Sequence, residues 1–221
     1  MCVNYLPVSA EQLNRHFEMA LEGEWADEVW QDHAAPIILR TPHGVVATLA
    51  GYGMVPRRHQ PAGQRAYSTQ NARLETVADR PSYRGPWQYA QFCLVPMLGF
   101  FEPRYDLRGR SERWLIRRND HAPFAVAGLW RSWREADGRT SHAFTQLTLN
   151  ADQHPLMRQF HPPEDEKRSL VIVSPDHYSA WLHCRQPDAA LPLLKPFDPS
   201  DWTAEPRPRP SAKAARMESL F

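Results

Sequence analysis

The sequence predicts a domain of the α+β class, in which a largely antiparallel β-sheet carries short helices at its periphery. Segments with strand character outnumber helical ones. They also adjoin one another along the chain, whereas a doubly wound parallel sheet would alternate its strands with long helices. We expect a single domain over residues 1–202, followed by a disordered tail rich in Pro, Arg and Ala over residues 203–221.

The helical signals are short. A helix is expected over residues 10–22, because Ser9 and Gln12 match a capping box, apolar residues recur at helical spacing as far as Leu21, and Gly23 is a typical terminator. Other short helices are expected at residues 71–78 and 82–89, in part of residues 151–160, and from Ser174-Pro175-Asp176 onward.

The strand signals begin with residues 36–40 and 44–50, which flank a turn, and an exposed loop is expected at residues 57–70. Buried strands are further expected at residues 92–96, 98–102 and 169–174. Two hairpins are also predicted, one joining residues 113–118 to 124–133 through Asn119-Asp120, and one joining residues 124–133 to 143–149 through Asp137-Gly138.

Composition excludes several classes of protein. Hydrophobic residues make up 42% and charged residues 23% of the 221 residues, as is usual for globular proteins. No apolar run approaches the ~20 residues that span a bilayer, and no secretory signal is visible. The three cysteines argue against a disulfide framework and for a reducing compartment, so we expect a cytoplasmic protein. CxxC and HExxH spacings are absent, and we expect neither a metal nor a cofactor.

Arginine is distributed unevenly along a chain whose formal net charge is only +1. Six arginines fall within residues 57–84 and six more within residues 104–118. The guanidinium fork suits phosphate oxygens, so these clusters predict nucleic-acid binding if they meet in space. The alternative is compositional, because GC-rich coding raises the arginine content whatever the function.

Cys2 follows the initiator Met1, and removal of Met1 would leave a free α-amine and a thiol on one residue. Their unperturbed pKa values are about 8 and about 8.5, so each has a reactive fraction near neutral pH. The amine can form an imine with an aldehyde, and the adjacent thiol can then close a five-membered thiazolidine ring. The alternative is that cysteine stands at this position by chance.

Five short blocks follow Met1-Cys2 in order: Tyr52–Pro56, Asn71–Thr76, Cys93–Pro96, Gly99–Glu102 and Phe124–Trp130. As an ordered set they resemble the SOS response-associated peptidase (SRAP) family, whose members capture abasic sites in single-stranded DNA. The resemblance covers roughly residues 2–183 and implies that the predicted sheet is barrel-like.

Three departures from the family pattern are visible. Val3-Asn4 stands where the family has Gly-Arg, and Pro103 stands where it commonly has Trp. The family's His-(Asp/Asn)-Arg-Met-Pro block is matched only by His161, which Pro162-Pro163 follows. His154 is the nearest rival, although His161 is better placed relative to the strand at residues 169–174.

The resemblance implies four catalytic residues. Cys2 would be the nucleophile, and Glu102 would relay protons during imine formation and ring closure. Asn71 would hold Cys2 or the opened sugar by hydrogen bonds, and His161 would bind a sugar hydroxyl or shuttle a proton. The alternatives are a surface or salt-bridged Glu102, a helix-capping Asn71 and an ordinary loop His161.

Candidate DNA contacts lie near these residues in the sequence. Arg73 would bind a phosphate beside the lesion, Arg80 and Arg84 would add positive charge, and Tyr52 and Met54 would stack against unpaired bases. The alternatives are an ion pair of Arg73 with Glu75 or a neighbouring carboxylate, and core positions for Tyr52 and Met54.

We therefore expect a monomeric, nucleoid-associated protein that crosslinks itself to abasic sites in single-stranded DNA during the response to DNA damage. Its enzymatic character would be that of a peptidase or lyase, with peptidase action limited to the self-processing that exposes Cys2. Two alternatives stay open. One is an N-terminal-nucleophile cysteine amidohydrolase, and the other is a non-enzymatic nucleic-acid-binding module in which Cys2 is incidental.

Overall fold

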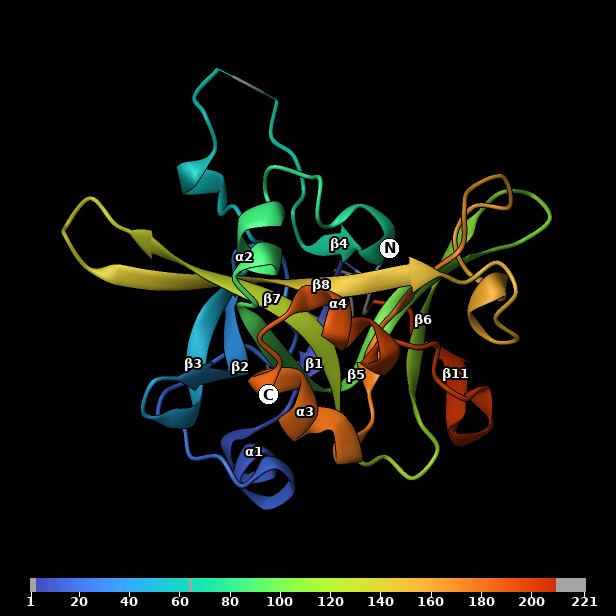
Figure 1. Cartoon of the computed structure of the whole chain (residues 1–221). Helices are drawn as coiled ribbons and strands as arrows, with labels where there is room; N and C mark the ends of the chain where they lie inside the picture. Colours follow the sequence, from blue (N-terminus) through green and yellow to red (C-terminus); the bar gives the residue numbers. More distant parts are fainter. Residues whose placement is uncertain (1–2, 64, 210–221) are drawn as a thin grey trace, which may run out of the picture.

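Five strands form a closed barrel in the computed structural model, which describes residues 3–63 and 65–209 (Figure 1). They follow one another around the ring in the order β7-β8-β3-β2-β5, and a further pairing between β5 and β7 closes it. All neighbours in the ring are antiparallel except β3 and β8. The predicted barrel-like, largely antiparallel α+β domain is therefore confirmed. The ring strands are β2 (Ala34–Thr41), β3 (Gly44–Tyr52), β5 (Phe92–Tyr105), β7 (Phe124–Arg134) and β8 (Thr140–Asn150).

Shorter strands extend this barrel, and short helices cover it. The strands β1 and β6 pair with β5, β4 and β9 with β8, β10 with β7, and β11 with β6. Their bounds are β1 (Tyr5–Pro7), β4 (Asn71–Arg73), β6 (Ser111–Arg118), β9 (Arg168–Leu170), β10 (Ile172–Val173) and β11 (Trp202–Pro206). The α-helices are α1 (Ala10–Phe17), α2 (Arg84–Gln88), α3 (Tyr178–His183) and α4 (Pro187–Ala190). No helix in the described part of the chain is long and apolar enough to cross a membrane.

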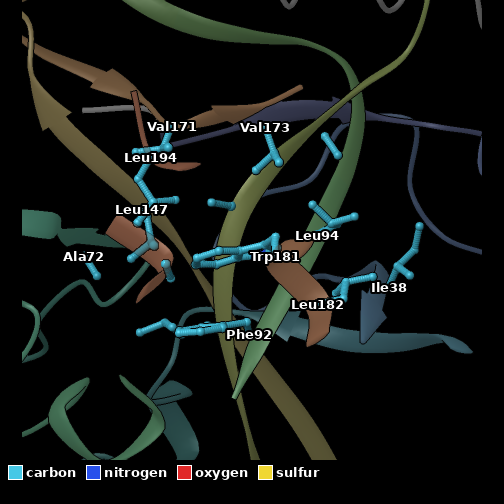
Figure 2. Packing of buried hydrophobic residues seen from close by; sticks show 14 of the residues in the cluster. Ile38, Ala72, Phe92, Leu94, Leu147, Val171, Val173, Trp181, Leu182 and Leu194 are labelled. Carbon is cyan, nitrogen blue, oxygen red and sulfur yellow. The ribbon is translucent and has the colours of Figure 1, made fainter. Parts of the chain in front are cut away.

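Alternate residues along a strand face opposite sides of the sheet, and they contribute here to two separate apolar clusters. Cys93 and Val95 of β5 belong to the cluster on the inner face of the barrel, while Phe92 and Leu94 belong to the cluster beneath the helices. Trp181 of α3 lies at the middle of the outer cluster (Figure 2). Its ring stacks on Phe92 with centroids 4.2 Å apart, and its indole N–H donates to the Cys93 carbonyl at 2.8 Å. These contacts fix α3 against β5.

Strand β5 changes partners along its length, and this change positions the candidate site. Residues 92–97 pair with β7, and residues 100–105 pair with β6. Gly99 lies at the changeover, where an added Cβ would be 2.8 Å from the Leu115 side chain and 3.0 Å from the Ile116 carbonyl oxygen. Glycine therefore allows β6 to approach β5 closely, three residues before Glu102.

Several predicted elements are confirmed. The hairpin of β2 and β3 extends the two expected strands, and β7 and β8 form the second predicted hairpin, with Gly138 at a φ of +83° in its turn. The capping box of Ser9 and Gln12 is present at the start of α1. That helix ends at Phe17 rather than at residue 22, because Glu18 adopts a left-handed conformation (φ 56°) and caps it.

Other predictions were wrong because tertiary pairing overrode local preference. Residues 71–73 form β4, which pairs in parallel with β8, and only residues 74–76 are helical, as a 3-10 turn. The expected hairpin between residues 113–118 and 124–133 does not form. Strand β6 lies between β5 and β11, whereas β7 pairs with β5, β8 and β10.

The predicted domain boundary at residue 202 was also wrong. Strand β11 pairs with β6 from Trp202 opposite Arg118 to Pro206 opposite Trp114 (Figure 1). Trp202 is 9% exposed, and its ring centroid lies 4.6 Å from that of Phe124. The first residues of the predicted tail are therefore part of the folded domain, and residues 210–221 lie outside the described residues.

Candidate active site

A carboxylate and an imidazole meet below the surface at the end of β5. The Glu102 side chain is 2% exposed and the His161 side chain 4%, and Nε2 of His161 lies 2.9 Å from Oε2 of Glu102. The backbone N–H of His161 donates to the Pro103 carbonyl at 2.8 Å, and its φ of +68° turns the loop toward β5. Such a pair can pass a proton to or from a group bound beside it.

Val3 and Asn4, the first residues that the structure describes, are held next to the Glu102–His161 pair. The backbone N–H of Phe101 donates to the Asn4 carbonyl at 3.2 Å, and the Gln70 side-chain amide donates to the Val3 carbonyl at 2.8 Å. Gln70 is only 4% exposed, so its amide group is fixed by its surroundings. Cys2 itself lies outside the described residues.

Asn71 enters the same region from β4. Its strand pairs with β8 so that Asn71 lies opposite Gln146, and the Gln146 N–H donates to the Gln70 carbonyl at 2.9 Å. The Tyr83 hydroxyl donates to the Asn71 carbonyl at 3.1 Å. Burial raises the pKa of Tyr83 to about 12, so the hydroxyl keeps the proton that it donates. Asn71 is thus a strand residue rather than a helix cap.

A cavity of about 340 Å³ opens beside these residues. Glu28 lies near this cavity and links Asn4 and Arg113, two of the residues that line it. Asn4 donates its side-chain N–H to Glu28 at 2.5 Å, and a guanidinium nitrogen of Arg113 lies 2.7 Å from the same carboxylate. The cavity is lined by Val3, Asn4, Phe101, Glu102, Pro103, Ser111, Glu112, Arg113 and Arg209.

The rival histidine has a structural role. Nδ1 of His154 accepts the N–H groups of Leu156 and Met157 at 3.2 and 3.1 Å, and its Nε2 lies 3.0 Å from the Phe197 carbonyl oxygen. Both ring nitrogens therefore have backbone partners, and burial lowers the pKa of His154. His161, and not His154, is the histidine beside Glu102.

Two predicted DNA contacts require correction. Tyr52 and Met54 are both 0% exposed, so neither presents a surface on which a base could stack. The Tyr52 hydroxyl donates to the Gln146 side chain at 3.0 Å, and its ring stacks on Phe144 with centroids 5.2 Å apart. The alternative that both are core residues describes their positions.

The three predicted arginine contacts have different surroundings. Arg73 has a half-exposed side chain and pairs with Glu166 at 2.7 Å rather than with Glu75. Arg80 is exposed, and Arg84 lines a separate hollow together with residues of α4. Several other arginines of the two sequence clusters also pair with carboxylates: Arg57 with Asp32, Arg58 with Glu135, Arg110 with Asp106 and Arg118 with Asp120.

Sequence reasoning missed Gln70, Glu28 and Arg113. Gln70 directly precedes the Asn71–Thr76 block, and this position was the available signal. Nothing in the sequence pairs Glu28 with Arg113, because they are brought together by the fold: Val29 bridges to Tyr5 of β1, β1 pairs with β5, and β5 pairs with β6. Within the described residues, no group of three or more His, Cys, Asp or Glu side chains is placed to hold a metal ion.

The chain is similar in sequence to several known proteins. Three proteins of Bacillus subtilis (strain 168) are similar over 141 residues, which is 62% of this chain. They are named abasic site processing proteins YoaM, YobE and YoqW, and are 30%, 30% and 29% identical to it. The matched region spans 58%, 60% and 59% of their own lengths, which is less than two thirds of each.

Solved structures share the fold over nearly the whole chain. A protein from Bordetella bronchiseptica is 28% identical and superposes with a TM-score of 0.84, covering 94% of this chain and 100% of its own. A protein from Bacteroides thetaiotaomicron is 20% identical, with a TM-score of 0.70 over 93% of this chain and 91% of its own. The sequence profile described as SOS response associated peptidase (SRAP) matches residues 1–208. The chain belongs to the SRAP family.

Proposed function

We propose that this protein captures abasic sites in single-stranded DNA covalently, through Cys2 once Met1 has been removed. The observation that carries the proposal is that residues from distant segments lie at or beside one cavity. Val3, Asn4 and Glu102 line it. The Gln70 side chain, next to Asn71 in the chain, donates to the Val3 carbonyl, and His161 contacts Glu102. Cys2 is joined to Val3 by one peptide bond, so the groups around Val3 are those that would act with it.

The proposed chemistry needs no cofactor or oxidant. The ring-opened abasic sugar presents an aldehyde. The α-amine of Cys2 adds to its carbonyl carbon, and loss of one water molecule gives an imine. The thiol sulfur then adds to the imine carbon, while the thiol proton ends on nitrogen. The product is a thiazolidine ring that links the chain to DNA, and no atom is oxidised or reduced.

Glu102 and His161 would supply the proton transfers of this sequence. Loss of water requires an acid beside the departing hydroxyl, and ring closure requires a base for the thiol. A buried carboxylate in contact with an imidazole can serve in both steps, because the proton can rest on either group. Asn71 would position the opened sugar or the amine, since its amide both donates and accepts hydrogen bonds.

A single strand is the substrate that this arrangement favours. An abasic site in a single strand is reached without the cost of opening a duplex. Arg73 and Arg80 are exposed near Asn71 and would contact the flanking phosphates, so noncovalent affinity should fall as salt rises. The names of the Bacillus subtilis relatives, abasic site processing proteins, agree with this substrate.

The test is an oligonucleotide with one abasic site, analysed on a denaturing gel. Wild-type protein is expected to form a slowly migrating adduct whose mass is that of the chain without Met1 plus the DNA minus one water. Cys2→Ala should abolish the adduct, whereas Cys184→Ala, which removes a half-buried thiol, should not. Cys93 offers no rival nucleophile, because burial raises the pKa of its thiol well above its usual range.

Glu102→Gln tests the proton relay. The amide keeps the size of the carboxylate but cannot exchange a proton, so adduct formation should slow by roughly 10²-fold or more. Binding to an intact single strand should stay unchanged. An adduct formed by Cys2→Ala, or by protein that retains Met1, would contradict the proposal. Steady turnover of amide substrates by the wild type would favour the amidohydrolase instead.

A further inference from the structure

The segment after β11 continues along β6 toward the candidate active site. The Arg207 N–H donates to the Arg113 carbonyl at 2.8 Å, and the Arg113 guanidinium donates to the Arg207 carbonyl at 3.4 Å. These bonds prolong the β11–β6 pairing beyond Pro206. The chain is therefore docked on β6, which forms one wall of the cavity, as far as Arg207, two residues before Arg209. We call residues 202–209 the C-terminal strap.

Arg209 brings a guanidinium group to this cavity. It lines the cavity together with Val3, Asn4 and Glu102. Its Cζ atom lies 4.3 Å from the centre of the Trp30 ring, a cation–π contact. An aromatic face restrains the plane of the guanidinium while leaving its N–H edges able to donate. Arg209 is thus held in place by a contact that does not use its hydrogen-bond donors.

The other charged groups that line the cavity already have partners. Arg113 is matched by Glu28, and Glu102 lies against His161. Glu112 accepts a hydrogen bond from the Trp114 indole at 2.9 Å. Among the described residues, no carboxylate oxygen lies within 4.0 Å of the Arg209 guanidinium nitrogens. Arg209 therefore brings to the cavity a positive charge that no described carboxylate pairs with.

We propose that Arg209 binds a phosphodiester group of the DNA strand next to the abasic site, which makes the C-terminal strap part of the active site. This inference rests on the proposed function, because the ligand is the strand whose aldehyde Cys2 would capture. A guanidinium fork donates to two oxygens of one phosphate, and such charge-assisted bonds are the stronger ones. Trp30 is a positioning residue, since it acts by holding Arg209.

The test compares Arg209→Ala with Arg207→Ala, a matched loss of charge on the same strap. Arg207 is 64% exposed and lies 4.0 Å from Glu205. Binding to an intact, non-abasic single strand is measured by fluorescence anisotropy over a range of salt concentrations. For Arg209→Ala we expect roughly tenfold weaker binding. The slope of log K against log salt should also be smaller by about 0.7, the value for one phosphate contact on a single strand.

Trp30→Leu supplies a second readout. It should weaken binding in the wild-type background but not in the Arg209→Ala background, because its effect passes through Arg209. Equal salt slopes for Arg209→Ala and Arg207→Ala would overturn the inference, and so would additive losses for Trp30→Leu and Arg209→Ala. Adduct formation by wild type is scored separately on abasic DNA, so failure of the proposed function is distinguishable from failure of the phosphate contact. Thermal unfolding confirms that each variant is folded.

Discussion

Gln70 offers a direct test of how the start of the chain is positioned. Its amide N–H donates to the Val3 carbonyl at 2.8 Å, and its amide oxygen accepts from the Ser68 hydroxyl at 3.0 Å. Gln70→Ala removes the anchor, but Val3 is 49% exposed, so water can replace the lost donor. The net cost is therefore that of an ordinary hydrogen bond, about 0.5–1.5 kcal/mol.

This cost should appear as a slower reaction rather than as unfolding. If the anchored position of Val3 is the reactive one, losing 0.5–1.5 kcal/mol slows adduct formation by roughly two- to tenfold. Single-turnover time courses on abasic DNA measure the effect, and Ser68→Ala, which removes the hydroxyl that hydrogen-bonds Gln70, should slow the reaction less. An unchanged rate for Gln70→Ala would refute the idea that this hydrogen bond sets the position of the N-terminal residues.

Three further predictions concern the scaffold. Trp181→Ala should lower the free energy of unfolding in urea by about 3–5 kcal/mol, because it empties the centre of the outer cluster and removes the stack on Phe92. Gly99→Ala should destabilise the fold and slow adduct formation, because its Cβ would meet the Ile116 carbonyl oxygen at 3.0 Å; unchanged melting would contradict this. Burial lowers the pKa of His154 in the folded protein. The neutral side chain therefore contributes fully to stability above the unfolded pKa of about 6.5, and this contribution is lost as the pH falls below that value. His154→Gln should flatten that decline in a pH series of urea midpoints.

Local patterns predicted what local physics decides. The capping box at Ser9, the turn at Gly138 and the buried character of β5 all depend on residues close in sequence. Strand β4 was not predicted because its partner β8 lies about 75 residues further along the chain, and no residue near Asn71 indicates that pairing. The β6–β7 hairpin was predicted wrongly for the converse reason, since a suitable turn says nothing about which strand competes for the pairing.

The candidate site likewise combines residues that could be predicted locally with contacts that depend on the fold. Glu102 could be named from its block, but its contact with His161 joins residues that are 59 positions apart and needed the fold. Choosing His161 over His154 rested on position relative to one strand. The structure adds the chemical reason, because both nitrogens of His154 already serve backbone groups. Tyr52 and Met54 were misjudged because aromatic and thioether side chains look alike in sequence whether they serve a core or a surface.

The contacts of Asn4 suggest a physical reason why this chain can have asparagine where the family pattern has arginine. Asn4 is 3% exposed, so a family arginine at this place would need a carboxylate as its partner. Glu28, whose side chain is 30% exposed, binds the shorter Asn4 amide here, while Arg113 of β6 supplies the guanidinium. Arg113 also packs 3.3 Å from the centre of the Phe101 ring, beside Glu102. In this chain, the positive charge beside Glu28 comes from β6 and not from position 4. Exchanging the two residues, Asn4→Arg with Arg113→Asn, should preserve adduct formation better than Arg113→Asn alone, because only the single variant leaves Glu28 without a cation.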